Sequence, residues 1–385
     1  MRLKRVGVAL TILPLVLLPA CSDESQAAPR SGSREVITKG TDERTGAYDV
    51  VPGWWKEAPN HDDEWMWGNV AGVAVDNADR IIVIARGDFP ADQSVPRRGR
   101  TRSTNFIVVA DRNGNIVEQW SQWDSIFTLP HQVYINPYDP ERHVWVVDGG
   151  GTDGPGQVVK FTNDGSELVM RLGDRDNPKS EAAARAIADP DPFSYGLPAK
   201  LAFLPDGSFL LADGYWNSRV IKYTGDGEFV MKWGSQGTGP GEFDLLHGLA
   251  LDRAGRVYVS DRQNERIQIF TQGGEFIEGW TGIFDPVNIF IDENESVWVL
   301  DASLNRVSRY SMEGELLYHW GAYGEAGALG RGTWDGGLSL PHQMDVDEEG
   351  NLYIASYNGR WVNKFVPKSG ADPAKLVAPR MLLSQ

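Results

Sequence analysis

Residues 247–280 read HGLALDRAGRVYVSDRQNERIQIFTQGGEFIEGW. This stretch contains four short runs in which apolar and polar residues alternate, at 247–252, 256–261, 266–270 and 275–280. The segments between the runs are RAG, RQNE and TQGG, which are rich in turn-forming residues. Alternation with a period of two, interrupted by Gly, Asn and Asp, predicts four antiparallel strands joined by tight turns.

The same unit recurs along the chain from residue 69 onward. Its copies begin near Ala71, His131, Ala199, His247, Val287 and His342. Four strands per unit, repeated six times, predict an all-β, six-bladed β-propeller. The sixth copy stops after three strands, and we expect the run YDVVPGWW (48–55) to supply its outer strand. The segment KSEAAARAIAD (179–189) predicts a short helix within the long loop 174–196.

The two ends of the chain lie outside this repeat. Residues 1–21 combine early basic residues, an apolar stretch and a cysteine, which resembles a bacterial lipoprotein signal with Cys21 as the lipidated residue. A plain secretory signal is the alternative. We expect residues 22–45 to form a polar tether, 46–368 the propeller and 369–385 a C-terminal tail. The prediction is an exported monomer that contacts the membrane of the cell envelope only through its lipid anchor.

Charge excludes one class of partner. The formal net charge is −16, whereas a protein that binds nucleic acid presents a basic face to the phosphates. We therefore expect no nucleic-acid partner.

Three of the six histidines occupy one slot of the repeat, in every second copy. They are His131 in LPHQV, His247 in LLHGL and His342 in LPHQM. Blades of a six-bladed propeller stand about 60° apart, so alternate copies direct these imidazoles at one point on the axis. Three imidazoles that leave a fourth position open are typical of a catalytic zinc site. The alternative is three structural histidines that bond to the backbone.

The other copies and the other histidines are consistent with this pattern. The same slot in the remaining copies holds small residues that leave room at the axis: Ala71, Ala199 and Val287. The remaining histidines fall outside the slot, and we expect them at the surface: His61, His143 and His319.

Two arginines and a tyrosine depart from the repeat where second strands end. Arg86 follows that strand in the first copy and Arg262 in the fourth, so the two would face each other across the axis. Guanidinium groups match carboxylates in geometry, which favours a small, carboxylate-bearing substrate. Tyr215, in DGYWNSR (213–219), lies near the same level. Surface ion pairs and aromatic packing are the alternative roles of these residues.

Together these strings resemble the peptidyl-α-hydroxyglycine α-amidating lyase family, a six-bladed propeller of NHL repeats. The resemblance spans about residues 65–368 and rests on GVAVD…ARGD (72–88), LPHQV, DGYWNSR, LLHGLALD, SDRQNERIQIF (260–270) and LPHQM. It implies zinc on the three histidines, Tyr215 and Arg86 as the catalytic pair, and Arg262 as a further active-site arginine. The implied reaction cleaves the N–Cα bond of a C-terminal α-hydroxyglycine and yields an amide and glyoxylate.

The resemblance also implies a structural calcium, bound partly through the backbone carbonyls of Val73 and Val133. A carboxylate should follow the third histidine, but this chain has Gln343 there. An amide oxygen can bind Ca²⁺ but contributes no charge, so Gln343 weakens the expectation of calcium.

Three functions are compatible with the sequence. The first is a zinc-dependent lyase that acts on a peptidyl or N-acyl α-hydroxyglycine. The second is a non-enzymatic cell-surface NHL propeller that binds a partner or ligand. The third keeps the metal but hydrolyses a lactone, which the histidines favour less because lactone-acting propellers use carboxylates around calcium.

Overall fold

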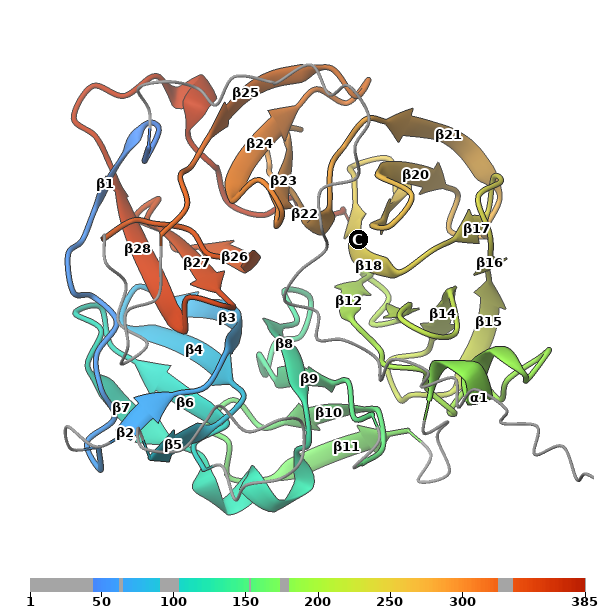
Figure 1. Ribbon diagram of the computed structural model, residues 1–385, viewed down its shortest axis with the longest axis horizontal. Helices are drawn as coiled ribbons and strands as arrows, with labels where there is room; N and C mark the ends of the chain where they lie inside the picture. The colour runs from blue at the N-terminus through green and yellow to red at the C-terminus, as the bar shows by residue number, and fades with distance from the viewer. Residues whose placement is uncertain are drawn as a thin grey trace, which may run out of the picture. The chain divides into compact units, whose positions relative to one another are not determined.

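Six four-stranded antiparallel sheets stand around a common centre in the computed structural model (Figure 1). The structure describes residues 44–61, 65–90, 104–151, 154–173, 180–324 and 335–384. The predicted signal, Cys21 and nearly all of the tether therefore lie outside the described residues. The all-β, six-bladed propeller predicted from the repeat is confirmed.

Blades one to five each come from one repeat, the sixth combines the last repeat with the N-terminal strand, and the first strand of each repeat lies nearest the centre (Figure 1). Blades one to three consist of β3 (Val70–Asn77), β4 (Arg80–Ala85), β6 (Ile107–Ala110) and β7 (Ile116–Gln119); β8 (Pro130–Ile135), β9 (Val144–Asp148), β10 (Gln157–Phe161) and β11 (Leu168–Leu172); and β12 (Lys200–Phe203), β13 (Phe209–Asp213), β14 (Arg219–Tyr223) and β15 (Phe229–Trp233).

The other three blades follow the same order. They consist of β18 (Leu246–Leu251), β19 (Val257–Asp261), β20 (Arg266–Phe270) and β21 (Phe276–Thr281); β22 (Pro286–Ile291), β23 (Val297–Asp301), β24 (Arg306–Tyr310) and β25 (Leu316–Trp320); and β26 (Pro341–Val346), β27 (Leu352–Ser356), β28 (Trp361–Pro367) and β1 (Tyr48–Val50).

Short elements occupy the connections. Two small ladders pair β2 (Trp65–Trp67) with β5 (Asp88–Pro90), and β16 (Ser235–Gln236) with β17 (Glu242–Phe243). The described helices are η1 (Ser121–Ile126), α1 (Glu181–Arg185) and η2 (Pro373–Lys375). The short helix predicted within 179–189 is thus present as α1. The described residues include no helix with the length and apolar character that a membrane span requires.

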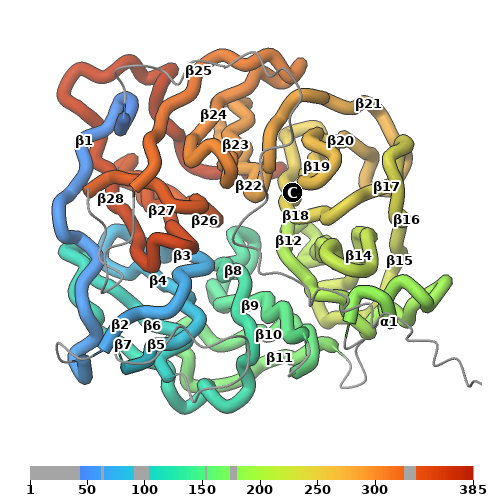
Figure 2. The backbone as a smooth tube through the Cα atoms, in the orientation of Figure 1, coloured from blue at the N-terminus to red at the C-terminus, as the bar shows by residue number. Residues whose placement is uncertain are grey.

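The N-terminal strand closes the ring, as predicted. Strand β1 pairs with β28 in the sixth blade, and Tyr48 lies opposite Pro367. The Tyr48 ring is fully buried and lies 5.8 Å from the ring of Trp320 in blade five. Figure 2 shows this strand, in blue, along the red strand of the last repeat. The two ends of the propeller are therefore joined by backbone hydrogen bonds.

The hydrophobic core is divided among the seams between blades. Each of six buried clusters in the described chain mixes residues of two neighbouring sheets, as Ile84 of blade one and Val146 of blade two do in the first cluster. Burial of apolar surface at every seam holds the innermost strands at a fixed distance from the axis. The slot residues are therefore held in place by a rigid scaffold.

The C-terminal segment lies across the end of the channel where the first strands finish. The Met381 amide donates to the Ile291 carbonyl oxygen at 2.9 Å, and the Leu383 amide donates to the Tyr138 hydroxyl at 2.8 Å. These partners belong to blades five and two, so the segment crosses the axis. Only the other end of the channel, where the slot residues lie, carries the candidate site.

Candidate active site

A β-bulge presents each slot histidine. The register between first and second strands shifts between Pro130 and Gln132, so His131 is the extra residue. The same shift occurs at His247 and at His342. Bulges leave one residue outside the ladder and redirect its side chain. The repeat pattern located the slot, but the sequence analysis did not predict the bulge that aims it.

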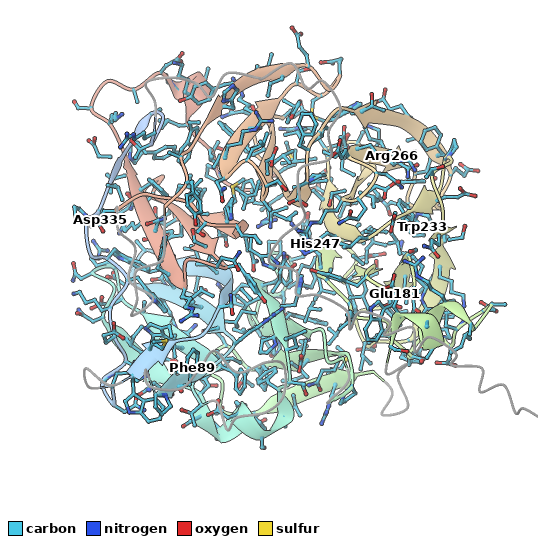
Figure 3. The ribbon with its side chains drawn as sticks, viewed as in Figure 1. Phe89, Glu181, Trp233, His247, Arg266 and Asp335 are labelled. Atoms are coloured by element: carbon cyan, nitrogen blue, oxygen red, sulfur yellow. The ribbon has the colours of Figure 1, made fainter. Side chains whose placement is uncertain are left out.

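The structure brings the three slot histidines together on the axis. Their ligand nitrogens all lie within 4.8 Å of one another, and all three residues are buried. Their ring centroids are 4.7–5.1 Å apart. Figure 3 shows His247 near the centre of the ring and Trp233 towards its rim. The three side chains form a cluster able to hold a metal ion.

The backbone of the alternate blades sets the tautomer of each histidine. Nδ1 of His131 lies 2.9 Å from the Ala199 carbonyl oxygen, and Nδ1 of His247 lies 2.6 Å from that of Val287. Nδ1 of His342 lies 2.6 Å from the carbonyl oxygen of Ala71. A carbonyl only accepts, so each Nδ1 carries the hydrogen and each Nε2 presents a lone pair. The small slot residues therefore not only leave room at the axis but also orient the histidines through their backbone carbonyls.

Burial keeps these imidazoles neutral. The pKa of His342 is lowered to about 3, mainly by burial; the bond to Ala71 opposes this shift, and the positive charges of Arg86 and Arg262 add to it. Burial also lowers the pKa of His131 and of His247 well below the usual range. Neutral imidazole is the form that binds a metal ion.

Tyr215 contacts two of the three imidazoles. Its hydroxyl lies 3.1 Å from Nε2 of His131 and 3.1 Å from Nε2 of His247. Both nitrogens are acceptors, and the hydroxyl has one hydrogen to donate. A phenol in contact with the ligand nitrogens is suited to move a proton where a substrate would meet the metal.

Arg86 approaches the cluster from blade one and stacks on a tyrosine that the sequence analysis missed. Its guanidinium lies 4.5 Å from the ring centroid of Tyr357, a residue only 9% exposed. The Tyr357 ring lies 5.4 Å from that of His342. Tyr357 stands just beyond β27, at the channel end of a second strand, as Arg86 and Arg262 do. This shared position in the repeat could have indicated Tyr357 as a site residue from the sequence.

Arg262 is oriented by Asp285 and Ser303. Its Nε donates to Asp285, and Nη2 lies 3.5 Å from the second carboxylate oxygen. Ser303 donates to the same carboxylate at 2.6 Å. The positive charge of Arg262 contributes to the lowered pKa of all three slot histidines. Arg262 therefore forms an ion pair with Asp285, which was its alternative role, and its charge also acts on the slot histidines.

Two of the three residues implied as calcium ligands, Gln343 and Val133, bond to each other. Gln343 Nε2 donates to the Val133 carbonyl oxygen at 2.6 Å, and Gln343 Oε1 accepts from the Val133 amide at 3.2 Å. Val73 is buried in the neighbouring first strand. Because the Gln343 amide occupies the side of Val133 that a cation would need, these residues do not fit a calcium ion.

Two histidines expected at the surface are buried. His61 has a fully buried side chain whose Nε2 lies 2.5 Å from Asp88, and its Nδ1 lies 3.3 Å from Glu57. His143 is 7% exposed and bonds to Asp139. The prediction missed that Asp88, 27 residues from His61, and Asp139, only four residues before His143, pair with these imidazoles. His319, on the outer strand β25, is partly exposed.

Comparison with known proteins identifies relatives of two kinds. The NHL repeat model matches residues 243–270. Human NHL repeat-containing protein 3 is 28% identical over 338 residues, which cover 85% of this chain and 86% of that protein. Peptidyl-alpha-hydroxyglycine alpha-amidating lyase 1 of Drosophila melanogaster is 25% identical over 346 residues, which cover 81% of this chain and 60% of that protein.

Solved structures share the fold at much lower identity. A streptogramin B lyase structure superposes with a TM-score of 0.53 at 13% identity and covers 83% of this chain and 97% of that chain. This likeness concerns the fold alone. The chain is therefore a six-bladed β-propeller with an NHL repeat, and it is similar to both the peptidyl-α-hydroxyglycine α-amidating lyases and NHL repeat-containing protein 3.

Proposed function

We propose that the protein is a metal-dependent lyase that cleaves an N-acyl α-hydroxyglycine into an amide and glyoxylate. The observation that carries this proposal is the contact of the Tyr215 hydroxyl with Nε2 of both His131 and His247. Relatives named amidating lyases support the same reaction. A structural histidine cluster would not require a phenol on its ligand nitrogens.

Zinc is the metal that we propose for His131, His247 and His342. The donor set suits zinc because the three imidazoles are neutral, present Nε2, and donate from Nδ1 to backbone carbonyls that fix their orientation. When bound, zinc would supply Lewis acidity that makes the substrate hydroxyl more acidic.

Residues of the chain would transfer the protons and stabilise the charges that develop in this reaction. Cleavage forms the C=O bond of glyoxylate from the α-hydroxyl, which loses its proton, while the N–Cα bond breaks and its electron pair stays on nitrogen. The nitrogen then gains a proton to become the amide. We assign the proton transfer at the hydroxyl to Tyr215. We assign stabilisation of the developing negative charge to Arg86, and binding of the substrate carboxylate to Arg262.

The test is release of glyoxylate from α-hydroxyhippurate by the folded chain loaded with zinc. We expect turnover that stops when a chelator removes the metal and returns when zinc is added back. A preparation with one zinc per chain and no turnover on any N-acyl α-hydroxyglycine would reject the lyase.

The second candidate is a non-enzymatic propeller that binds a partner at the cell surface. It is favoured by the similarity to NHL repeat-containing protein 3, which extends over most of both chains. This function predicts purified protein without stoichiometric metal, and partner binding that survives His131→Ala. Metal analysis of the purified chain separates the two candidates.

A further inference from the structure

A layer of polar side chains crosses the channel directly beneath the histidines. It consists of the residues that follow the slot in four blades, which are at most 2% exposed: Gln132, Lys200, Asn288 and Gln343. The two remaining blades have glycine at this position, Gly72 and Gly248. We call the four polar residues the cross-channel layer.

Gly72 provides space that the Gln343 side chain uses. Gln343 of blade six bonds to Val133 of blade two and so passes blade one. A Cβ atom on Gly72 would lie 2.4 Å from Gln343 Oε1, so a larger residue there would force the Gln343 side chain to shift. Lys200 of blade three donates from Nζ to the Ile289 carbonyl oxygen of blade five at 3.1 Å and so spans blade four. Each long side chain therefore bridges two blades that flank a third.

The other two members complete the layer. Gln132 Nε2 donates to the His342 carbonyl oxygen at 3.4 Å, and Gln132 Oε1 accepts from the Tyr134 hydroxyl. Asn288 Nδ2 lies 3.5 Å from the same His342 carbonyl. Blades two, five and six are thereby tied at one level. At this level the carbonyl oxygens of Val133, Ile289 and His342 accept from amide and amine donors.

We propose that the cross-channel layer closes the propeller axis in place of a divalent cation, so that no calcium binds at this level of the channel. The carbonyl of Val133, which the calcium ligand set requires, accepts from Gln343. Lys200 directs an amine at the Ile289 carbonyl, two residues beyond the slot, as Val73 and Val133 are in their blades. Burial already disfavours the charge on Lys200, and the Arg380 charge adds to this by lowering its pKa. A cation bound at this level would have to displace the Lys200 amine from the Ile289 carbonyl oxygen.

This inference does not depend on the lyase reaction, and thermal unfolding of the zinc-loaded chain tests it. In calcium-free buffer, CaCl₂ up to 5 mM should change the melting temperature no more than MgCl₂ at the same concentration. Elemental analysis should find no calcium that co-purifies with the chain. A saturable rise specific to Ca²⁺, or one calcium per chain, would overturn the proposal.

A double variant reverses the arrangement. Lys200→Ala together with Gln343→Asp removes the amine and restores a carboxylate after the third histidine. We expect this variant to gain a Ca²⁺-specific rise in melting temperature of roughly 5 °C at saturating calcium. Gln343→Asp alone is the matched control and should not respond, because Lys200 remains. A folded double variant that ignores Ca²⁺ would show that these two residues are not what excludes the ion.

Discussion

Nδ1 of His342 lies 2.6 Å from the carbonyl oxygen of Ala71, although the two residues are 271 positions apart in the chain. This bond joins the last blade to the first at the level of the candidate site. The equivalent bonds of His131 to Ala199 and of His247 to Val287 link the remaining blades in pairs. The ring therefore orients these candidate metal ligands with its own backbone, without a carboxylate partner for any of the three.

The tyrosine hydroxyl should matter for turnover and not for the metal. Tyr215→Phe keeps the ring that packs beside His131 and removes the group that contacts Nε2. We expect kcat to fall by about 10²–10⁴-fold because proton transfer is lost. Zinc content should stay at the wild-type value. Steady-state assay with α-hydroxyhippurate and elemental analysis of the same sample measure both. A variant that turns over at the wild-type rate would remove Tyr215 from the mechanism.

Removal of one slot histidine should abolish metal binding. His342→Ala deletes a buried neutral imidazole whose orientation is set by Ala71, and we expect zinc affinity to fall by at least ~100-fold. His319→Ala is the matched control, since His319 lies on the outer strand β25, away from the axis. Competition with a zinc-binding dye gives both affinities. Equal affinities in the two variants would place the metal elsewhere.

The aromatic ring beneath Arg86 should position that guanidinium. Tyr357→Phe keeps a ring face 4.5 Å from the guanidinium carbon, whereas Tyr357→Leu removes it. A buried cation–π contact is worth on the order of 1–2 kcal/mol, so kcat/KM should fall by about 10-fold in the leucine variant. The phenylalanine variant should stay within about 2-fold of wild type. If both variants lose the same activity, the contribution comes from the hydroxyl and the stacking argument fails.

The pair of His61 and Asp88 should make stability depend on pH. Burial opposes the charge on His61, but hydrogen bonds to Asp88 and Glu57 outweigh it and raise the pKa of His61 from 6.5 to about 9. Because the folded-state pKa is the higher one, the stabilisation is complete below pH 6.5 and is lost as pH rises through about 9. Its size is on the order of 1–3 kcal/mol.

The comparison with His61→Gln isolates this contribution. Melting temperatures of wild type and variant, measured from pH 6 to pH 10, should differ most at the acidic end and converge near the alkaline end. A difference that stays constant over this range would show that His61 acts through packing and not through its charge.

Several features of the fold and site could be predicted from the sequence because they are local or periodic. Alternation and turn residues identified the strands, and the recurrence of the unit identified six blades. The short sixth copy pointed to β1 as its missing strand, which the pairing with β28 confirms. The three histidines could be recognised as a cluster because residues at the same offset in each repeat lie at the same height in the channel.

Other features arise between blades, where neighbours in space are far apart in sequence. No pattern indicated that Ala71, Ala199 and Val287 would accept from the histidines through their carbonyls, since any residue type offers that group. The burial of His61 was missed for the same reason, because its partner Asp88 reaches it from another strand. Tyr357 follows a second strand, as Arg86 and Arg262 do, but no sequence motif marked it as a site residue.

The sequence by itself determined the architecture and the identity of the three metal-ligand candidates, because repetition in the chain becomes rotation about the propeller axis. Only the tertiary structure decided which nitrogen of each imidazole faces the centre. It also revealed that Gln343 crosses the channel beside Gly72 and that Lys200 reaches from blade three to blade five. Hydrogen bonds between blades depend on the closed ring, and a chain read in order does not reveal which backbone groups that ring brings within reach.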